Sequence, residues 1–375
     1  MARRALGPAT LAVVRAVADA WRDPARDPAG SWLVGCSGGS DSLALAVGAR
    51  LACDRAGAAD RLGAVVVDHG LQHGSAEVAA TVRDRLIGIG YRPQAVQVRR
   101  VVVEPAAIAT RGLEGAARSA RYTAYEQALG AIGGPAAGSE VLLGHTRDDQ
   151  AETVLLGLVR GSGVRSLAGI APRRGPYVRP LLELTRSTLR ECCRENDLTW
   201  WEDPFNADDR YARVRVRHRV LPALEDAFGG TGSVTAALAR TAALARTDAD
   251  FLDALAEAAE EDAVRPPDDL DCAELAFLPE ALRTRVVRRW LVRAGAREPG
   301  AVHVEAVCRL VTHWNGQKGI DVPGLRVVRR DGRVVVAGAE AATGEAVRDL
   351  PGDATGCDRR AGRQVPPGDG AASGV

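Results

Sequence analysis

The chain contains almost no lysine, and its positive charge comes from arginine. Lys318 is the only lysine, so no Gly-Lys-Ser or Gly-Lys-Thr sequence exists and a phosphate site of the Walker type is excluded. Lysine and arginine together number 49 against 48 aspartates and glutamates, which gives a formal net charge of +1. Attraction to nucleic acid therefore has to come from a local basic surface rather than from the field of the whole molecule.

The sequence also lacks paired cysteines and long apolar runs. None of its seven cysteines forms a Cys-x-x-Cys pair, and the adjacent Cys192 and Cys193 are unsuited to an ordinary disulfide or a zinc knuckle, which favours a reducing compartment. No run is long enough to span a membrane. Apolar residues recur at helical spacing near the start, at Leu11, Val14, Ala18 and Trp21. This pattern indicates an amphipathic helix rather than a signal peptide, and we expect a cytoplasmic protein without membrane contact.

What the chain does have is a Gly-rich turn between a buried strand and a helix. The turn consists of Ser37, Gly38, Gly39, Ser40, Asp41 and Ser42. Such a junction places free backbone N–H groups and the positive end of a helix around an anion, so it predicts a phosphate site. Asp41 adds a carboxylate, which suits Mg²⁺ better than phosphate. The alternative is an ordinary Gly/Ser turn that happens to contain an aspartate.

Short β-branched runs alternate with helical segments from residue 31 to about 190. The predicted strands are 31–36, 62–67, 94–103 and 141–144, and the predicted helices are 42–51, 76–88, 115–129 and 149–159. This alternation predicts an α/β fold with a doubly wound parallel sheet. Ligands bind such sheets at the carboxyl ends of the strands, where the loops after Cys36, Val67 and Gly144 would gather.

The character of the sequence changes after Pro222. Residues 234–264 predict one long helix or a broken pair, and further helices are expected at 278–294 and 302–314. Two β-rich arms around Asp331-Gly332 predict a hairpin. We therefore expect four parts: an N-terminal helix in 1–30, a catalytic domain in 31–221, a smaller and mostly helical domain in 222–340, and a disordered tail in 341–375.

Two further groups of polar residues follow predicted strands. Asp68 and His69 come directly after one strand, where they would line a nucleotide pocket; a strand-terminal aspartate making a local turn is the alternative. His145 precedes a helix on which Asp149 and Glu152, three residues apart, share a face. Two carboxylates and an imidazole would hold Mg²⁺, bind a cationic substrate or take a proton from an amine. The alternative is a capping box running from Asp149 to Glu152, which only completes a helix start.

Arginine gathers in two places. Arg118 and Arg121 share a helix face with Tyr122 beside them, an arrangement suited to phosphate or to stacking on a base. The densest basic segment lies between the two predicted domains and contains Arg210, Arg213, Arg215, Arg217 and Arg219. Its position predicts contact with an RNA backbone. For both groups, a solvated arginine face is the alternative.

The Gly-rich turn resembles the SGGxDS loop of the PP-loop (ATP pyrophosphatase) superfamily, whose members cleave ATP to AMP and pyrophosphate. When further segments of the sequence are considered together with this loop, the chain resembles one family of the superfamily in particular, the tRNA(Ile)-lysidine synthetase family. The matching segments are SGGSDS at 37–42, VDHGL at 67–71, AARSARY at 116–122, HTRDDQAET at 145–153, RGSG at 160–163, RPLL at 179–182 and WEDPFNADDRYARVRVRHRVLP at 201–222. The sequence departs from the family where Thr146 replaces a second histidine, Val214 an asparagine and Phe205 a small hydroxyl residue.

The resemblance implies a reaction with two steps. ATP would adenylate C2 of the wobble cytidine in an isoleucine tRNA with a CAU anticodon, and free L-lysine would then displace AMP to give lysidine. The ATP-binding residues would be those of the loop at 37–42 together with Asp68 and His69, with Mg²⁺ held by Asp41. A homodimer is one expectation for the assembly.

The resemblance also implies roles for the remaining residues. Lysine would be bound by Asp149 and Glu152, and His145 or one of these carboxylates would accept its proton. Catalysis would thus rest on Asp41, Arg118, His145 and Asp149, with Arg118 contacting phosphate or the activated base. The tRNA would be bound by the second domain and by Arg213, Arg215 and Arg217.

Three other functions compete with this one. A PP-loop tRNA thiolase usually needs paired or ligating cysteines, and a synthetase of the amidotransferase type needs a glutaminase-like Cys-His signature; neither pattern is evident. A non-catalytic nucleotide-binding module would not need Asp149 and Glu152. Incorporation of lysine, ammonia or sulfur into tRNA separates these functions.

Overall fold

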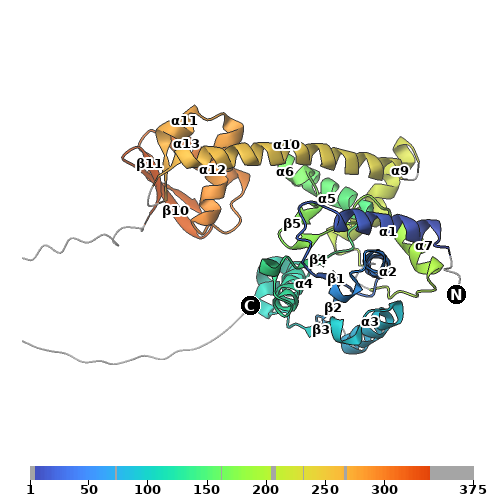
Figure 1. Ribbon diagram of the computed structural model, residues 1–375. Helices are drawn as coiled ribbons and strands as arrows, with labels where there is room; N and C mark the ends of the chain where they lie inside the picture. Colours follow the sequence, from blue (N-terminus) through green and yellow to red (C-terminus); the bar gives the residue numbers. More distant parts are fainter. Residues whose placement is uncertain are drawn as a thin grey trace, which may run out of the picture.

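Two sheets, each with its own helices, are joined by one long helix, α10, Ser233–Ala263 (Figure 1). The computed structural model describes residues 5–71, 74–161, 163–203, 208–230, 232–265 and 268–337. The predicted tail at 341–375 and Phe205 lie outside the described residues. Among the helices that are described, none combines the length and the apolar character that crossing a membrane requires.

The first sheet has six strands in the order β3-β2-β1-β4-β6-β5. The strands are β1 Trp32–Gly35, β2 Leu62–Asp68, β3 Val96–Arg100, β4 Glu140–Leu142, β5 Arg173–Arg174 and β6 Tyr177–Val178. All neighbours pair in parallel except β5, which pairs antiparallel with β6 at the edge. The predicted α/β fold with a doubly wound parallel sheet is confirmed, whereas the edge hairpin of β5 and β6 was not predicted.

The helices around this sheet are α1 Pro8–Trp21, α2 Ser40–Arg55, α3 Ser75–Ile89, α4 Pro105–Gly130, α5 Arg147–Val159, α6 Val164–Leu167, α7 Arg186–Glu195, α8 Ala212–Arg215 and α9 Leu221–Phe228. Short 3₁₀ segments at Ala59–Arg61, Pro93–Ala95 and Pro135–Ala137 and a π-helical segment at Val216–Val220 complete the set. Helices α1, α2, α3 and α7 pack on one face of this sheet and α4 on the other, while α6, α8 and α9 pack on other helices. The predicted helices all exist, but α4 begins ten residues early and breaks at Gly112, where φ is +71°, and α7 was missed.

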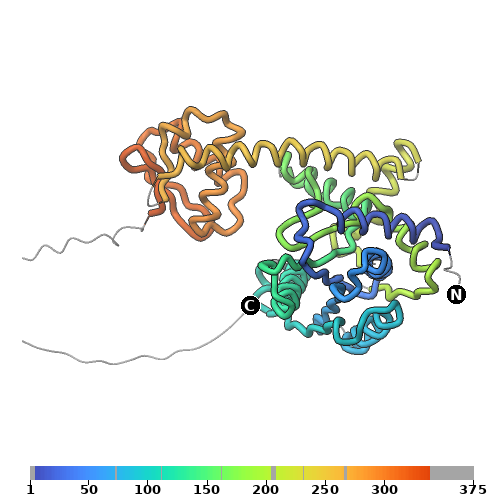
Figure 2. Tube along the Cα trace, in the orientation of Figure 1, coloured from blue at the N-terminus to red at the C-terminus, as the bar shows by residue number. Residues whose placement is uncertain are grey.

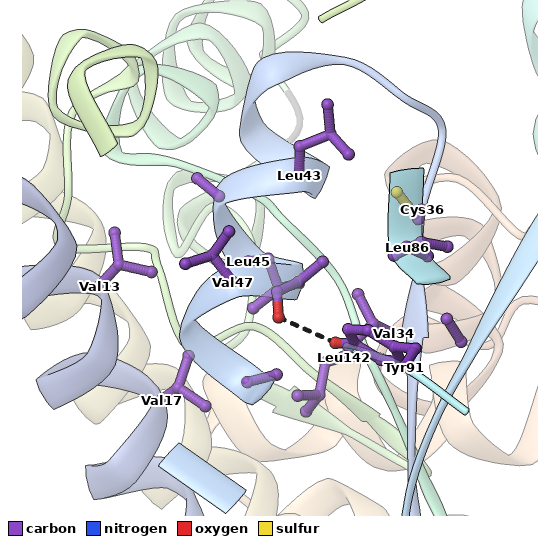
Figure 3. Close-up of a cluster of buried hydrophobic side chains, with 14 of the residues drawn as sticks. Val13, Val17, Val34, Cys36, Leu43, Leu45, Val47, Leu86, Tyr91 and Leu142 are labelled. Carbon is purple, nitrogen blue, oxygen red and sulfur yellow. Dashed lines mark hydrogen bonds between the residues drawn. The ribbon is translucent and has the colours of Figure 1, made fainter. Parts of the chain in front are cut away.

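Alternate residues of the central strand serve the two faces. Trp32 and Val34 of β1 pack in the core shared with α1, α2, α3 and α7, whereas Leu33 packs on the opposite side with Leu129 of α4. Figure 3 shows the first of these cores, in which the Tyr91 hydroxyl donates to the Ala46 carbonyl at 2.9 Å. Burial on both faces explains why β1 is apolar throughout.

The second sheet is antiparallel, with five strands in the order β7-β8-β11-β10-β9. The strands are β7 Val264–Arg265, β8 Asp269–Asp271, β9 Ile320–Val322, β10 Leu325–Arg330 and β11 Arg333–Val336, and the helices packed with them are α11 Cys272–Phe277, α12 Glu280–Arg293 and α13 Ala301–Thr312. The predicted hairpin is confirmed: Asp331 and Gly332 both have positive φ, as a two-residue turn of type I′ requires.

The second domain is mostly helical by residue count, as expected, but it also contains this antiparallel sheet, of which only the β10–β11 hairpin was predicted. Its other three strands are two or three residues long, too short to show an alternating pattern. Residues 234–264 do form one helix, and Figure 2 shows α10 continuing without a break from the first body to the second. Leu238 of α10 still packs with Leu155 of α5, so the domain boundary at 221/222 stays a prediction.

Candidate active site

The predicted phosphate loop lies at the carboxyl end of β1. Gly38 turns the chain with φ +82°, and α2 begins at Ser40. Ser42 Oγ accepts from the Ser37 N–H at 3.1 Å and donates to the Gly39 carbonyl at 3.0 Å, which closes the turn. No side chain of the described residues caps α2, so the first N–H groups of this helix are available to an anion.

The sheet places a second loop against the first. β1 lies between β2 and β4, so the loops after β1 and β4 meet where the strand order reverses, which is where open α/β sheets bind ligands. A Cβ atom on Gly144, just after β4, would lie 2.9 Å from the Asp41 carbonyl oxygen and 3.2 Å from the Ser42 nitrogen. These are backbone atoms, so the close approach of the two loops requires glycine at this position.

Gly144→Ala is therefore expected to displace the start of α2 and raise the KM for ATP at least about tenfold, since misplacing binding groups by a fraction of an ångström is costly. The matched control is Gly88→Ala on α3, where an added Cβ would meet nothing within 4 Å. Steady-state kinetics at varied ATP measure both variants. An unchanged KM in Gly144→Ala would show that the loops tolerate separation.

Arg186, which the sequence did not single out, joins the two loops. It is the first residue of α7, and its side chain is 16% exposed. Its Nη2 donates to Asp149 Oδ1 at 3.0 Å and to Glu152 Oε1 at 3.4 Å, while its Nε lies 3.5 Å from Asp41 Oδ2. One guanidinium thus contacts carboxylates from both α2 and α5.

Glu152 is fully buried and neutralised by arginines of the basic segment. Arg213 Nε donates to Glu152 Oε2 at 2.8 Å, and Arg217 Nε donates to Oε1 at 2.7 Å. Arg217 Nη2 also lies 3.6 Å from Asp149 Oδ1. Two of the three arginines predicted to bind tRNA therefore lie against the carboxylates predicted to bind lysine, while Arg215 donates to backbone carbonyls of its own segment.

The carboxylates of Asp41 and Asp149 differ in electrostatic environment. Burial raises the pKa of Asp41 to about 6, against the opposing effect of Arg186 and with a further rise from Asp149. Burial would also raise the pKa of Asp149, but Arg186, Arg213, His145 and the Thr146 N–H outweigh it and hold that pKa below its usual value. Nearby cations therefore outweigh the effect of burial on the pKa at Asp149 but not at Asp41.

His145 lies in the same cavity as the phosphate loop. The cavity has a volume of about 1000 Å³, and its lining includes Ser37, Asp41, Arg118, His145, Asp149 and Arg186. Burial, partly offset by Asp149, lowers the pKa of His145 to about 4, so the imidazole is neutral near pH 7. Its Nδ1 is buried and has no hydrogen-bond partner among the described residues. A buried nitrogen without a partner is uncommon in folded proteins, which makes His145 a candidate functional residue.

Thr146, one of the three departures from the family pattern, has a structural role. It is buried and serves as the N-cap of α5: its Oγ1 accepts from the Asp149 N–H at 3.2 Å, and its own N–H donates to Asp149 Oδ2 at 2.8 Å. The capping box thus joins Thr146 to Asp149, and the predicted box from Asp149 to Glu152 is wrong. Asp149 keeps its other oxygen, Oδ1, for the arginines and the cavity.

Two other predicted groups border the loop. Asp68, buried at the end of β2, accepts from the Gly70 N–H at 3.0 Å, the local turn that was the alternative. Both Asp68 and His69 also line a smaller cavity that shares Ser37 with the larger one. Arg118 Nη2 donates to the Tyr122 hydroxyl at 3.2 Å at the wall of the larger cavity. The Trp201 N–H donates to the Gly38 carbonyl at 2.9 Å, a contact that the sequence did not indicate, and this bond holds the loop to the segment that follows α7.

Within the part of the chain that the structure describes, no three His, Cys, Asp or Glu side chains gather as a metal site. A Mg²⁺ ion would have to rely on Asp41 and on phosphate oxygens of the substrate. That donor set fits Mg²⁺, which is commonly held by one or two carboxylates plus substrate phosphates.

Comparison with known proteins agrees with this geometry. A PP-loop domain matches residues 11–224, and a TilS substrate binding domain matches residues 270–335. The tRNA(Ile)-lysidine synthase of Thermobifida fusca is 50% identical over 88% of this chain and 98% of its own length. The enzymes of the same name from Streptomyces coelicolor and Mycobacterium bovis are 49% and 46% identical over 81% and 87% of this chain and 84% and 97% of their own lengths. The chain therefore belongs to the tRNA(Ile)-lysidine synthase family, with an ATP-binding PP-loop domain and a substrate-binding domain.

Proposed function

We propose that this chain ligates L-lysine to C2 of the wobble cytidine in an isoleucine tRNA with a CAU anticodon. The reaction consumes ATP and releases AMP and pyrophosphate. One observation carries the proposal: a single cavity brings the phosphate loop together with a neutral His145 and the carboxylate of Asp149. A site that only bound a nucleotide would need the phosphate loop but not His145 and Asp149. We further propose that the chain acts in the cytoplasm, where its tRNA substrate would be found. A homodimer is a separate proposal, which sedimentation of the full chain tests.

The first step joins the cytidine to AMP. The O2 atom of cytosine attacks the α-phosphorus of ATP, and the bond to pyrophosphate breaks. The N–H groups at the start of α2 and the hydroxyl of Ser37 would bind the departing pyrophosphate, while Ser42 keeps the turn closed. Mg²⁺, when bound, neutralises charge on the phosphates, and Asp41 would hold it. Arg118 lies across the same cavity, where it would contact the α-phosphate or the activated base.

The second step replaces AMP with lysine. The neutral ε-amine attacks C2, the C2–O bond to AMP breaks, and the nitrogen gives up a proton. Asp149 lines the cavity, so we assign it the contact with the ammonium group of lysine. Glu152, fully buried behind its arginines, supports that carboxylate rather than facing the cavity. His145 lines the same cavity and is neutral near pH 7, so we assign its imidazole the role of accepting the proton.

The basic segment would contact tRNA through those arginine N–H donors that are not used in contacts within the protein. Arg213 and Arg217 are 29% and 22% exposed and hold Glu152, whereas Arg215 lies on the same segment among backbone carbonyls. Their remaining N–H donors would bind phosphate. We propose that this segment positions the anticodon loop over the cavity.

The purified chain is expected to incorporate labelled lysine into an isoleucine tRNA transcript, with AMP formed in proportion. A transcript that differs only by uridine at the wobble position is the matched control and should remain unlabelled. Ammonium or a sulfur donor in place of lysine should give no product. AMP release that ignores both lysine and tRNA would contradict the proposed function.

A further inference from the structure

The guanidinium group of Arg186 occupies an unusual place for a cation. It belongs to the first residue of α7, where the helix dipole favours anions, and it is mostly buried. The Asp148 carboxylate accepts the Arg186 N–H at 2.9 Å, and Thr185 caps the helix, so the helix start is already satisfied without the guanidinium. The position of this side chain is explained by the carboxylates it contacts and not by the stability of α7.

Arg186 bridges groups that have different tasks. Asp41 belongs to the phosphate loop and α2, and Asp149 belongs to α5; the Arg186 side chain reaches both from a third element. We propose that Arg186 is a positioning residue of the reaction, which holds the carboxylate that serves ATP and the carboxylate that serves lysine in one arrangement. This inference rests on the proposed function, because it takes the roles of the two carboxylates from it.

The charges around Arg186 support this role. It faces Asp41 of α2 and Asp148, Asp149 and Glu152 of α5. Arg217 contacts the same oxygens of Asp149 and Glu152, and Arg213 contacts the other oxygen of Glu152. It is the largest influence that lowers the pKa of both Asp41 and Asp149 against burial. The surrounding carboxylates, Asp149 first among them, more than offset burial and raise the pKa of Arg186 itself, so its charge is permanent.

The lengths of the contacts indicate how the arrangement works. The contact from Arg186 to Asp41 is 3.5 Å, and the contact to Asp149 is 3.0 Å. Asp41 can therefore turn to a cation on the phosphates with little loss, while Asp149 keeps its stronger partner. Arg186 then retains Asp149 in place for the incoming amine throughout the first step.

Arg186→Gln tests the inference through the two steps measured apart, adenylation in single turnovers without lysine and lysine transfer at varied lysine. Adenylation should slow by less than about tenfold, since the 3.5 Å contact from Arg186 to Asp41 is longer than the 3.0 Å contact to Asp149. The KM for lysine in the second step should rise at least about tenfold, because Asp149 loses its strongest partner.

Two further variants make the test decisive. Arg186→Lys keeps the charge but has no planar fork, so it should restore the adenylation rate and leave the KM for lysine raised. Arg22→Gln, which removes a guanidinium that is 71% exposed and lies outside the cavity, is the control and should behave as wild type. An unchanged KM for lysine in Arg186→Gln would overturn the inference, and if Arg186→Gln fails to fold, an unchanged KM in Arg186→Lys overturns it alone. Failure of the wild type to incorporate lysine would instead contradict the proposed function.

Discussion

Asp41→Asn is expected to abolish adenylation while leaving tRNA binding intact. The substitution keeps the shape of the side chain but removes the only charged oxygen donor that the phosphate loop offers to a cation. Loss of one group that stabilises developing charge in an active site typically costs 10²–10³-fold in rate, and we expect roughly that loss or more. Formation of adenylated tRNA in a single turnover measures the rate, and a filter-binding titration measures tRNA affinity.

The same substitution should not destabilise the free protein. The pKa of Asp41 is about 6 in the folded chain, above its unfolded value of 3.8, so its contribution to stability is fully present below pH 3.8 and is lost as the pH rises through about 6. Two pKa units correspond to about 3 kcal/mol, which the ionised carboxylate costs at neutral pH and the amide does not. Asp41→Asn should therefore unfold at an equal or higher urea concentration near pH 7.

Asp54→Asn is the control on the same helix. Asp54 pairs with Arg50 near the far end of α2, away from the phosphate loop, and should leave adenylation unchanged. Loss of tRNA binding in Asp41→Asn, or adenylation within tenfold of wild type, would show that the role given to this carboxylate is wrong.

The phosphate loop was predictable because its chemistry is local. Gly38 takes the positive φ, and Ser37 and Ser42 close the turn, all within six residues that the sequence presents together. The strand before them and the helix after them follow from apolar runs on both sides. The turn itself is closed by these six residues, so its position could be inferred from sequence, whereas its contacts with Gly144 and Trp201 could not. The phosphate contact of its residues stays a prediction.

The partners of Glu152 were not predictable in the same way. Arg213 and Arg217 lie 61 and 65 residues further along the chain, and only the packing of α8 and the π-helical segment against α5 brings them to this carboxylate. Arginine spacing alone does not tell a surface that binds RNA from one that binds a buried acid. The composition of the segment predicted phosphate contact, whereas tertiary structure turned part of it inward.

Arg186 left a weaker signal in the sequence. Arg186 directly follows the capping residue Thr185, so its positive charge is unfavourable beside the positive end of the helix dipole. An anionic partner nearby is therefore expected. The identity of that partner could not be read, because Asp41 lies 145 residues away. The N-cap of α5 was misplaced for a smaller reason: Thr146 and Asp149 satisfy the capping pattern as well as Asp149 and Glu152 do.

Glu152→Gln is expected to give the largest loss of stability of any conservative change in this site. The glutamate is fully buried, and both of its oxygens accept from guanidinium groups, so the amide would leave Arg213 and Arg217 facing each other with less negative charge between them. Removing one partner of a buried ion pair typically costs 3–5 kcal/mol. We expect about 3 kcal/mol, the low end, because the two arginines keep 29% and 22% of their side-chain surface and remain partly hydrated.

Urea unfolding measures this change as a lower midpoint at an unchanged slope. The control is Asp208→Asn, which breaks the pair with Arg210 on the surface, where one partner is 81% exposed, and should leave the urea midpoint close to that of the wild type. The double variant Glu152→Gln with Arg213→Gln should lose less than the sum of the two single changes, since removing a cation relieves part of the imbalance. Additive losses would show that Glu152 and Arg213 do not stabilise each other, and the basic segment would then be free to turn outward. A measured coupling would instead mean that the segment proposed to contact tRNA is held to the helix proposed to bind lysine, so that a change in one alters the stability of the other.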